Sequence, residues 1–120
     1  MENFRRFQTS ADPFDRVWDV EFLWLQTGIS IRHADTVDVK FHVWSGEEKM
    51  EKIIALKHPD LLEVCHRTGR ALTDPFCSRV AAMHVKHALE TAEDLEKTLI
   101  TLPLEKLQEY ADQLRATGAA

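Results

Sequence analysis

Cysteine is scarce in this chain, with only Cys65 and Cys77 among 120 residues. A disulfide framework of the kind that stabilises small secreted domains needs more cysteines than this. We therefore expect two reduced thiols, with a single bridge as the alternative for an exported chain. A domain of this length buries roughly two-thirds of the surface that its unfolded chain exposes, so we expect that it needs neither a disulfide nor a metal to be stable.

Long apolar runs are also absent. The longest runs, residues 22–25 and 53–56, fall far short of the ~18 residues that span a bilayer. The N-terminal segment contains Arg5 and Arg6 but no apolar stretch after them, so it lacks the pattern of a secretory signal. These absences predict a soluble, cytoplasmic protein with no membrane partner.

The chain lacks an excess of positive charge, since 15 Lys and Arg residues stand against 20 Asp and Glu residues. A net charge of −5 argues against a general phosphate-binding surface, so we expect no nucleic-acid partner. The charge is uneven, because residues 57–89 are net basic whereas residues 90–112 are strongly acidic. Solvated helix faces account for this asymmetry, with a local anion site or a charge-guided contact as the alternative.

Motifs of known chemistry are missing as well. We find no glycine-rich phosphate loop, no G-x-S-x-G elbow, no C-x-x-C pair and no Lys/Arg strip interleaved with aromatic residues. The sequence therefore predicts no cofactor and offers no catalytic motif.

The sequence does contain a change in the spacing of its apolar residues along the chain. Residues 18–24 and 37–43 alternate between apolar and polar side chains, which is typical of strands with one buried face. Residues 53–56 lack this alternation, so they belong either to a strand that is buried on both faces or to the start of a helix. We expect a four-stranded antiparallel meander over about residues 16–57.

The register of this meander follows from keeping the apolar side chains on one face. We expect a three-residue loop at 34–36 and a tight turn at residues 27–28, where glycine permits a positive φ. The pairs that result are Ile31 with Val39, Ile29 with Phe41, Arg32 with Asp38, and Trp24 with Ile31.

After residue 57 the period becomes helical, and prolines mark the starts of the helices. We expect helices near 59–68, 75–90, 92–100 and 103–116, with Asp74 as an N-cap and a capping box from Thr91 to Asp94. The last helix has an apolar stripe that either covers the sheet or meets a second subunit. The fold class is therefore α+β: a single domain, residues 1–120, with a meander followed by three or four C-terminal helices packed on one face.

Cysteine and histidine, the usual zinc ligands, gather between residues 65 and 87. Cys77 and His84 are seven positions apart on one expected helix, hence roughly 10 Å apart along its axis, and are too far apart to share an ion. His84 and His87 alone make a weak signal, so we expect no metal site. We expect His87 to lie on the apolar stripe of its helix and His84 to face solvent.

Cys77 is also a candidate nucleophile, because a helix N-terminus lowers the pKa of a thiol. Asp74 beside it acts in the opposite direction. We therefore favour a buried, unreactive side chain at this position.

The polar face of the expected sheet is the main candidate surface. Its candidate contact residues are Arg32, Asp38, Lys40, His42 and Trp44, and we place Ser30, Leu23 and Leu25 on the same face. Exposed leucine and tryptophan beside charges favour a binding surface. We therefore expect a small regulatory or protein-binding module, with a protein partner or a second copy in a homodimer docked on this face or on the last helix.

The alternative is an enzyme or small-ligand binder with a pocket between the sheet and the helices. The candidate pocket residues are Trp18, Trp24, His33, Phe41, His84 and His87. A cavity of a few hundred Å³ with convergent polar groups would favour this alternative, whereas a flat apolar patch would favour the protein-binding module.

The absence of a metal and of a disulfide gives a direct prediction. Treatment with a chelator and a reductant should leave the melting temperature nearly unchanged, because a structural zinc site would contribute on the order of 10 kcal/mol to folding. Thermal melting followed by circular dichroism measures this. A protein that unfolds under this treatment would contradict the expected uninterrupted helix over residues 75–90.

Overall fold

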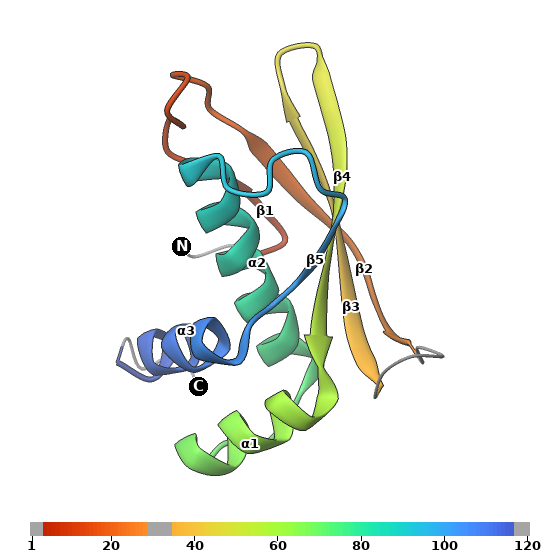
Figure 1. Ribbon diagram of the computed structural model, residues 1–120, viewed down its shortest axis with the longest axis vertical. Helices are drawn as coiled ribbons and strands as arrows, with labels where there is room; N and C mark the ends of the chain where they lie inside the picture. Colours follow the sequence, from red (N-terminus) through yellow and green to blue (C-terminus); the bar gives the residue numbers. More distant parts are fainter. Residues whose placement is uncertain (1–3, 29–34, 117–120) are drawn as a thin grey trace.

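The computed structural model describes residues 4–28 and 35–116 as one sheet with helices on one side of it (Figure 1). The strands are β1 (Arg6–Gln8), β2 (Asp19–Gly28), β3 (Thr36–Ser45), β4 (Glu48–Lys57) and β5 (Leu99–Thr101). The helices are α1 (His58–Thr68), α2 (Asp74–Thr91) and α3 (Leu104–Ala116).

The sheet is mixed, with the order β1-β2-β3-β4-β5. All neighbouring strands are antiparallel except β4 and β5, which are parallel. The α+β class and the C-terminal helices are confirmed. The expected four-stranded antiparallel sheet is corrected to five strands. Three of them, β2, β3 and β4, lie within residues 16–57, and the other two, β1 and β5, have three residues each and are too short to show a period.

The expected register between β2 and β3 is wrong. Thr27 and Gly28 do not form a turn but continue β2, pairing with Val37 and Thr36. Glycine permits a turn without requiring one, and the longer strand matches β3 almost along its full length. The partners expected for Ile29, Ile31 and Arg32 are therefore taken by β2 itself: Val39 pairs with Leu25, Phe41 with Phe22, and Asp38 with Gln26. Ile29, Ile31 and Arg32 lie outside the described residues.

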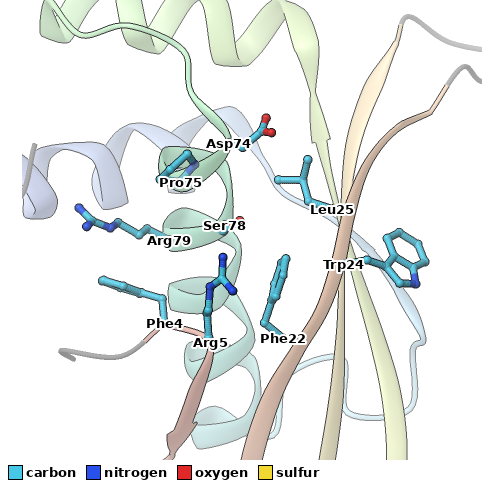
Figure 2. A pocket seen from close by; sticks show the side chains of 9 residues that line it. All are labelled: Phe4, Arg5, Phe22, Trp24, Leu25, Asp74, Pro75, Ser78 and Arg79. Atoms are coloured by element: carbon cyan, nitrogen blue, oxygen red, sulfur yellow. The ribbon is translucent and has the colours of Figure 1, made fainter.

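A β-bulge in β2 reverses the expected facing of its second half. Phe22 pairs with Phe41 and Trp24 pairs with the next residue, Lys40, so Leu23 is an extra residue without a partner. Trp24 consequently points away from the helices, whereas Phe22 and Leu25 point toward them (Figure 2). Strict alternation predicts Trp24 on the inner face and Leu25 on the outer face. The bulge makes this prediction wrong for both residues.

The helices all lie on one side of the sheet, with α2 running along its inner face (Figure 1). Between them lies a core whose largest fully buried side chains include Trp18, Phe41, Ile54 and Leu56. Helix α3 packs against α1 and α2, and its predicted apolar stripe is buried there. That stripe is therefore not a free contact surface. No helix within the described residues is long and apolar enough to cross a membrane.

The ends of α1 and α2 agree closely with the sequence. Gly69 ends α1 in the left-handed region at φ 66°. Helix α2 continues without interruption as expected, but its N-cap is Thr73 rather than Asp74, because the Thr73 hydroxyl accepts a hydrogen bond from the Phe76 N–H at 3.3 Å.

The helix expected at 92–100 does not form. The backbone has positive φ at Ala92 and Asp94, and the segment turns into β5. The Lys52 ammonium, buried on β4, donates hydrogen bonds to the backbone carbonyls of Asp94 and Leu95 at 3.2 and 2.6 Å, and to that of Lys97. Burial lowers the pKa of Lys52, and the negative charge of Asp94 opposes this. Backbone carbonyls that would accept hydrogen bonds within a helix instead accept them from the Lys52 side chain of β4.

The two histidines of α2 occupy the reverse of their expected positions. His84 is buried, and its Nδ1 lies 2.9 Å from the Tyr110 hydroxyl of α3. His87 lies nearer the surface, with its Nε2 3.3 Å from the Glu93 carboxylate. The sequence does not reveal on which side of α2 the helix α3 packs, and α3 is what covers His84. Burial, with a smaller effect from His87, lowers the pKa of His84 to about 4.

This buried histidine predicts a pH dependence of stability. The pKa of His84 is lower in the folded than in the unfolded chain, so its contribution is complete above its ordinary pKa of 6.5 and is lost as the pH falls toward 4. We expect acidification from about pH 7.5 to about pH 5 to lower the free energy of unfolding by about 2 kcal/mol through this group. Urea denaturation at both pH values measures it.

In the variant His84→Gln, the free energy of unfolding should change much less between the two pH values, because glutamine does not titrate. His66→Gln is the matched control: His66 is exposed on α1, so this variant should keep the pH dependence of the wild type. Equal pH dependence in His84→Gln and the wild type would contradict the prediction.

Candidate functional site

The side of the sheet opposite the helices is uncovered in the described residues (Figure 1). We call it the outer face. Its side chains follow from the strand register: Arg6 and Gln8 of β1, Asp19, Glu21, Trp24 and Gln26 of β2, Asp38, Lys40, His42 and Trp44 of β3, Lys49, Glu51, Ile53 and Ala55 of β4, and Leu99 and Thr101 of β5. The buried residues of β3 alternate with these, so the predicted alternation of this strand is confirmed.

Lys40 stands at the centre of the outer face. Its ammonium lies 5.6 Å from the centre of the Trp24 ring and forms an ion pair with Glu51 on β4. The hydrogen bond and the positive charge of Lys40 lower the pKa of Glu51. The lysine thereby holds an aromatic ring on one side and a carboxylate on the other.

Trp44 forms a second aromatic cluster on the same face. Its ring centre lies 5.3 Å from that of His42, and the Arg6 guanidinium lies 5.9 Å from it. Arg6 also pairs with Glu21 at 3.4 Å. The Trp44 ring therefore contacts the His42 ring on its own strand and the Arg6 guanidinium of β1.

The outer face has an apolar part toward β5. Ile53 is half-buried and pairs with Leu99, which is 58% exposed on the short edge strand. Both lie at the level of Lys40 and Trp24, since Ile53 pairs with Lys40 across the sheet. A row of two apolar side chains, one lysine and one tryptophan therefore crosses four strands.

The structure brings most of the predicted contact residues together. Asp38, Lys40, His42 and Trp44 share the outer face, whereas Arg32 and Ser30 lie outside the described residues. Sequence reasoning missed Trp24, Ile53 and Leu99. Only a register that included the bulge would have placed Trp24 here, and a three-residue strand carries no signal that would have placed Leu99.

The candidate pocket residues do not come together. Trp18 and Phe41 are fully buried in the core, and Trp24 points to the opposite side of the sheet. His84 contacts Tyr110 and His87 contacts Glu93. His33 lies outside the described residues. These side chains therefore do not line one cavity.

Neither an activated Cys77 thiol nor a cluster of metal ligands is found among the described residues. Burial, followed by the charge of Asp74, raises the pKa of Cys77 to about 12, so its thiol is protonated at neutral pH. Within residues 4–28 and 35–116, no three His, Cys, Asp or Glu side chains lie close enough together to hold a metal ion.

No protein-family model, no curated protein and no solved structure matches this chain. The function is therefore inferred from the chain's own residues.

The position of Trp24 predicts its contribution to stability. We expect Trp24→Ala to cost about 1–2 kcal/mol, because the ring is only partly buried and its known contact is with the Lys40 ammonium on the outer face, whereas Phe41→Ala should cost about 3–5 kcal/mol from the core. Urea denaturation of both variants makes the comparison. A cost for Trp24→Ala as large as that for Phe41→Ala would show that the ring is buried.

Proposed function

We propose that this protein is a small protein-binding module that pairs with a second copy of itself through the outer face. The observation that carries the proposal is an uncovered sheet face on which two tryptophans, Ile53 and Leu99 lie among charged side chains, of which Arg6 pairs with Glu21 and Lys40 with Glu51. Aromatic side chains are enriched at protein interfaces because they bury a large area and also make polar contacts.

The projected area of the outer face is close to the lower end of what a stable dimer buries. The three long strands have ten residues each, hence a length of roughly 33 Å at the usual rise per residue. At a strand spacing of about 4.8 Å, the three long strands cover roughly 480 Å² and the two three-residue edge strands add roughly 100 Å², which gives a projected area of roughly 570 Å². Stable interfaces bury about 800 Å² per partner on average, and the lower end of that class is about 600 Å².

The charges of the outer face permit a second copy to cover it. Its four carboxylates are each held within the face: Asp19 by Gln8, Glu21 by Arg6, Asp38 by Thr36 and Glu51 by Lys40. Each carboxylate therefore keeps a hydrogen-bond or ion-pair partner when it is covered, a cation for Glu21 and Glu51 and a neutral donor for Asp19 and Asp38. A buried carboxylate with no partner is the costly case in an interface. The chain as a whole has a net charge of −5, so two copies that met through more acidic surfaces would repel each other.

The alternative function, an enzyme or a small-ligand binder whose pocket is lined by the residues that the sequence suggested, is less well supported. Of those residues, the ones that the structure describes lie on different sides of the sheet or in the core. We therefore place self-pairing first.

Two exposed leucines provide a matched test. Leu99 is 58% exposed on the outer face, and Leu62 is 51% exposed on α1, on the opposite side of the sheet. Sedimentation velocity of the wild type from about 1 to about 200 µM should show a monomer–dimer equilibrium. Leu99→Glu should weaken the dimer at least tenfold, because it buries an unpartnered carboxylate, whereas Leu62→Glu should leave it unchanged.

Circular dichroism of each variant establishes that it is folded. A wild type that stays monomeric at every concentration would contradict self-pairing. A dimer that Leu62→Glu disrupts and Leu99→Glu does not would assign the interface to the helical side instead.

A further inference from the structure

Strand β2 has an unpaired edge over its second half. Strand β1 pairs with residues 19–21, and the Phe22 N–H donates a hydrogen bond to the Arg5 carbonyl at 2.7 Å. Beyond Phe22, within residues 4–28 and 35–116, no strand pairs with β2 on this side. We call residues 23–27 the open edge. Such an edge presents backbone N–H and C=O groups to which another extended chain can bind.

The register shows which backbone groups face the open edge. Along a strand, side chains and backbone groups alternate together, so residues with side chains on one face also point their N–H groups to one side. Phe22 has its side chain on the inner face and its N–H toward β1. After the bulge, Leu25 and Thr27 have their side chains on the inner face. The N–H and C=O groups of Leu25 and Thr27 are therefore those that the open edge offers.

Two cavities lie between the open edge and the start of α2. The first, of about 480 Å³, is lined by Phe22, Leu25 and Pro75 among others. The second, of about 260 Å³, has Thr27 in its lining. Asp74 lines both cavities. Figure 2 shows the first cavity, with the Asp74 carboxylate extending from α2 toward the sheet.

The spacing of the two cavities matches that of an extended chain. Leu25 and Thr27 are two positions apart, hence roughly 6.7 Å apart at the usual rise per residue. In a strand paired with β2, side chains two positions apart have the same spacing and point to the same face. One such side chain would enter each cavity. A helix does not offer this repeat, because its neighbouring side chains on one face are three or four positions apart.

The first cavity favours an apolar side chain. Phe22 and Leu25 are partly buried against the core, so they provide a fixed apolar wall. The two arginines of the lining are stacked on aromatic rings: the Arg5 guanidinium lies 5.7 Å from the centre of the Phe22 ring, and the Arg79 guanidinium lies 5.2 Å from that of Phe4. A side chain that packs on the apolar wall leaves both of these contacts in place.

The second cavity favours a cationic side chain. Asp35 and Asp74 both line it, and the other titratable side chains of its lining are His58 and Cys77. Neither aspartate forms an ion pair with another described residue. The net charge of the chain, −5, also attracts a basic partner.

We propose that the open edge binds an extended peptide of a partner protein as an added antiparallel strand, with an apolar side chain in the first cavity and a cationic one in the second. The peptide continues the line of β1, which is antiparallel to β2. In that direction it passes Thr27 before Leu25, so the cationic residue comes two positions before the apolar one. The groove lies on the inner side, away from Leu99, so peptide binding and self-pairing fail or succeed independently.

The acetylated and amidated pentapeptide Thr-Lys-Thr-Leu-Thr is a suitable probe, because it has both side chains at the required spacing and no terminal charge. Titration into the full-length protein, followed by ¹H–¹⁵N NMR, should give a dissociation constant on the order of 100 µM. Thr-Thr-Lys-Leu-Thr has the same composition, but its lysine and leucine are adjacent and point to opposite faces. It should bind at least tenfold more weakly. Thr-Glu-Thr-Leu-Thr tests the charge and should also bind more weakly.

Methylation of the peptide backbone tests the strand pairing directly. A methyl group on the backbone nitrogen of the lysine or of the leucine removes an N–H that faces β2, so each should weaken binding at least tenfold. A methyl group on the nitrogen of the middle threonine is the matched control. That N–H faces away from β2, so this peptide should keep most of its affinity.

Variants locate the peptide on the protein. Thr27→Pro removes an N–H from the open edge, where proline is tolerated, and should weaken binding at least tenfold. Asp74→Asn should weaken binding of the lysine peptide about threefold, as expected for one partly exposed ion pair. Asp112→Asn is the matched control, since Asp112 is exposed on α3.

Circular dichroism of each variant establishes that it is folded, and the methylated peptides keep the test decisive if Thr27→Pro does not fold. Three results would overturn the proposal: no saturable shift up to about 2 mM peptide, equal binding of the peptide with adjacent lysine and leucine, or an equal loss from methylation at the middle threonine. Tighter binding of the glutamate peptide would overturn the assignment of the second cavity. A dimer that Thr27→Pro dissociates would assign the open edge to a second copy instead.

Discussion

One extra residue in β2, Leu23, determines what each face of the sheet presents. Without it, Trp24 would point into the helices and Leu25 away from them. The bulge is held in place because the pairs on either side of it, Phe22 with Phe41 and Leu25 with Val39, set apolar side chains on the inner face. It places an aromatic ring beside Lys40 on the outer face and turns Leu25 toward the helices on the inner face. The side chains that both faces present therefore depend on this single irregularity.

A buried charge has a comparable effect at the other end of the sheet. Lys52 sits on the inner face of β4, where an apolar residue would be ordinary, and its ammonium is satisfied by backbone carbonyls of residues 94–97. A buried ammonium costs several kcal/mol unless such partners surround it. The turn that supplies them also directs the chain into β5. The position of Leu99 on the outer face therefore depends on a side chain more than forty positions earlier in the sequence.

The sequence predicted those elements whose signal is local. Strand β3 alternates cleanly because its inner face is buried throughout, and prolines mark the starts of all three helices. It did not predict β1, β5 or the turn after α2, because these form through contacts with distant strands rather than through their own period. In the candidate site, Asp38, Lys40, His42 and Trp44 followed from alternation alone, whereas Trp24 and Leu99 needed the bulge and the Lys52 contacts.

The parallel pairing of β4 and β5 also bears on how the chain folds. The two strands are adjacent in space but separated in sequence by α1 and α2, so β5 joins the sheet only after a long loop has closed. Until then the edge of β4 is open at residues 53–56, the run Ile-Ile-Ala-Leu, which has no charge or proline to interrupt it. An apolar strand edge of this kind readily pairs with another chain. Once they have paired, the three residues of β5 close this part of the β4 edge, an effect out of proportion to their length.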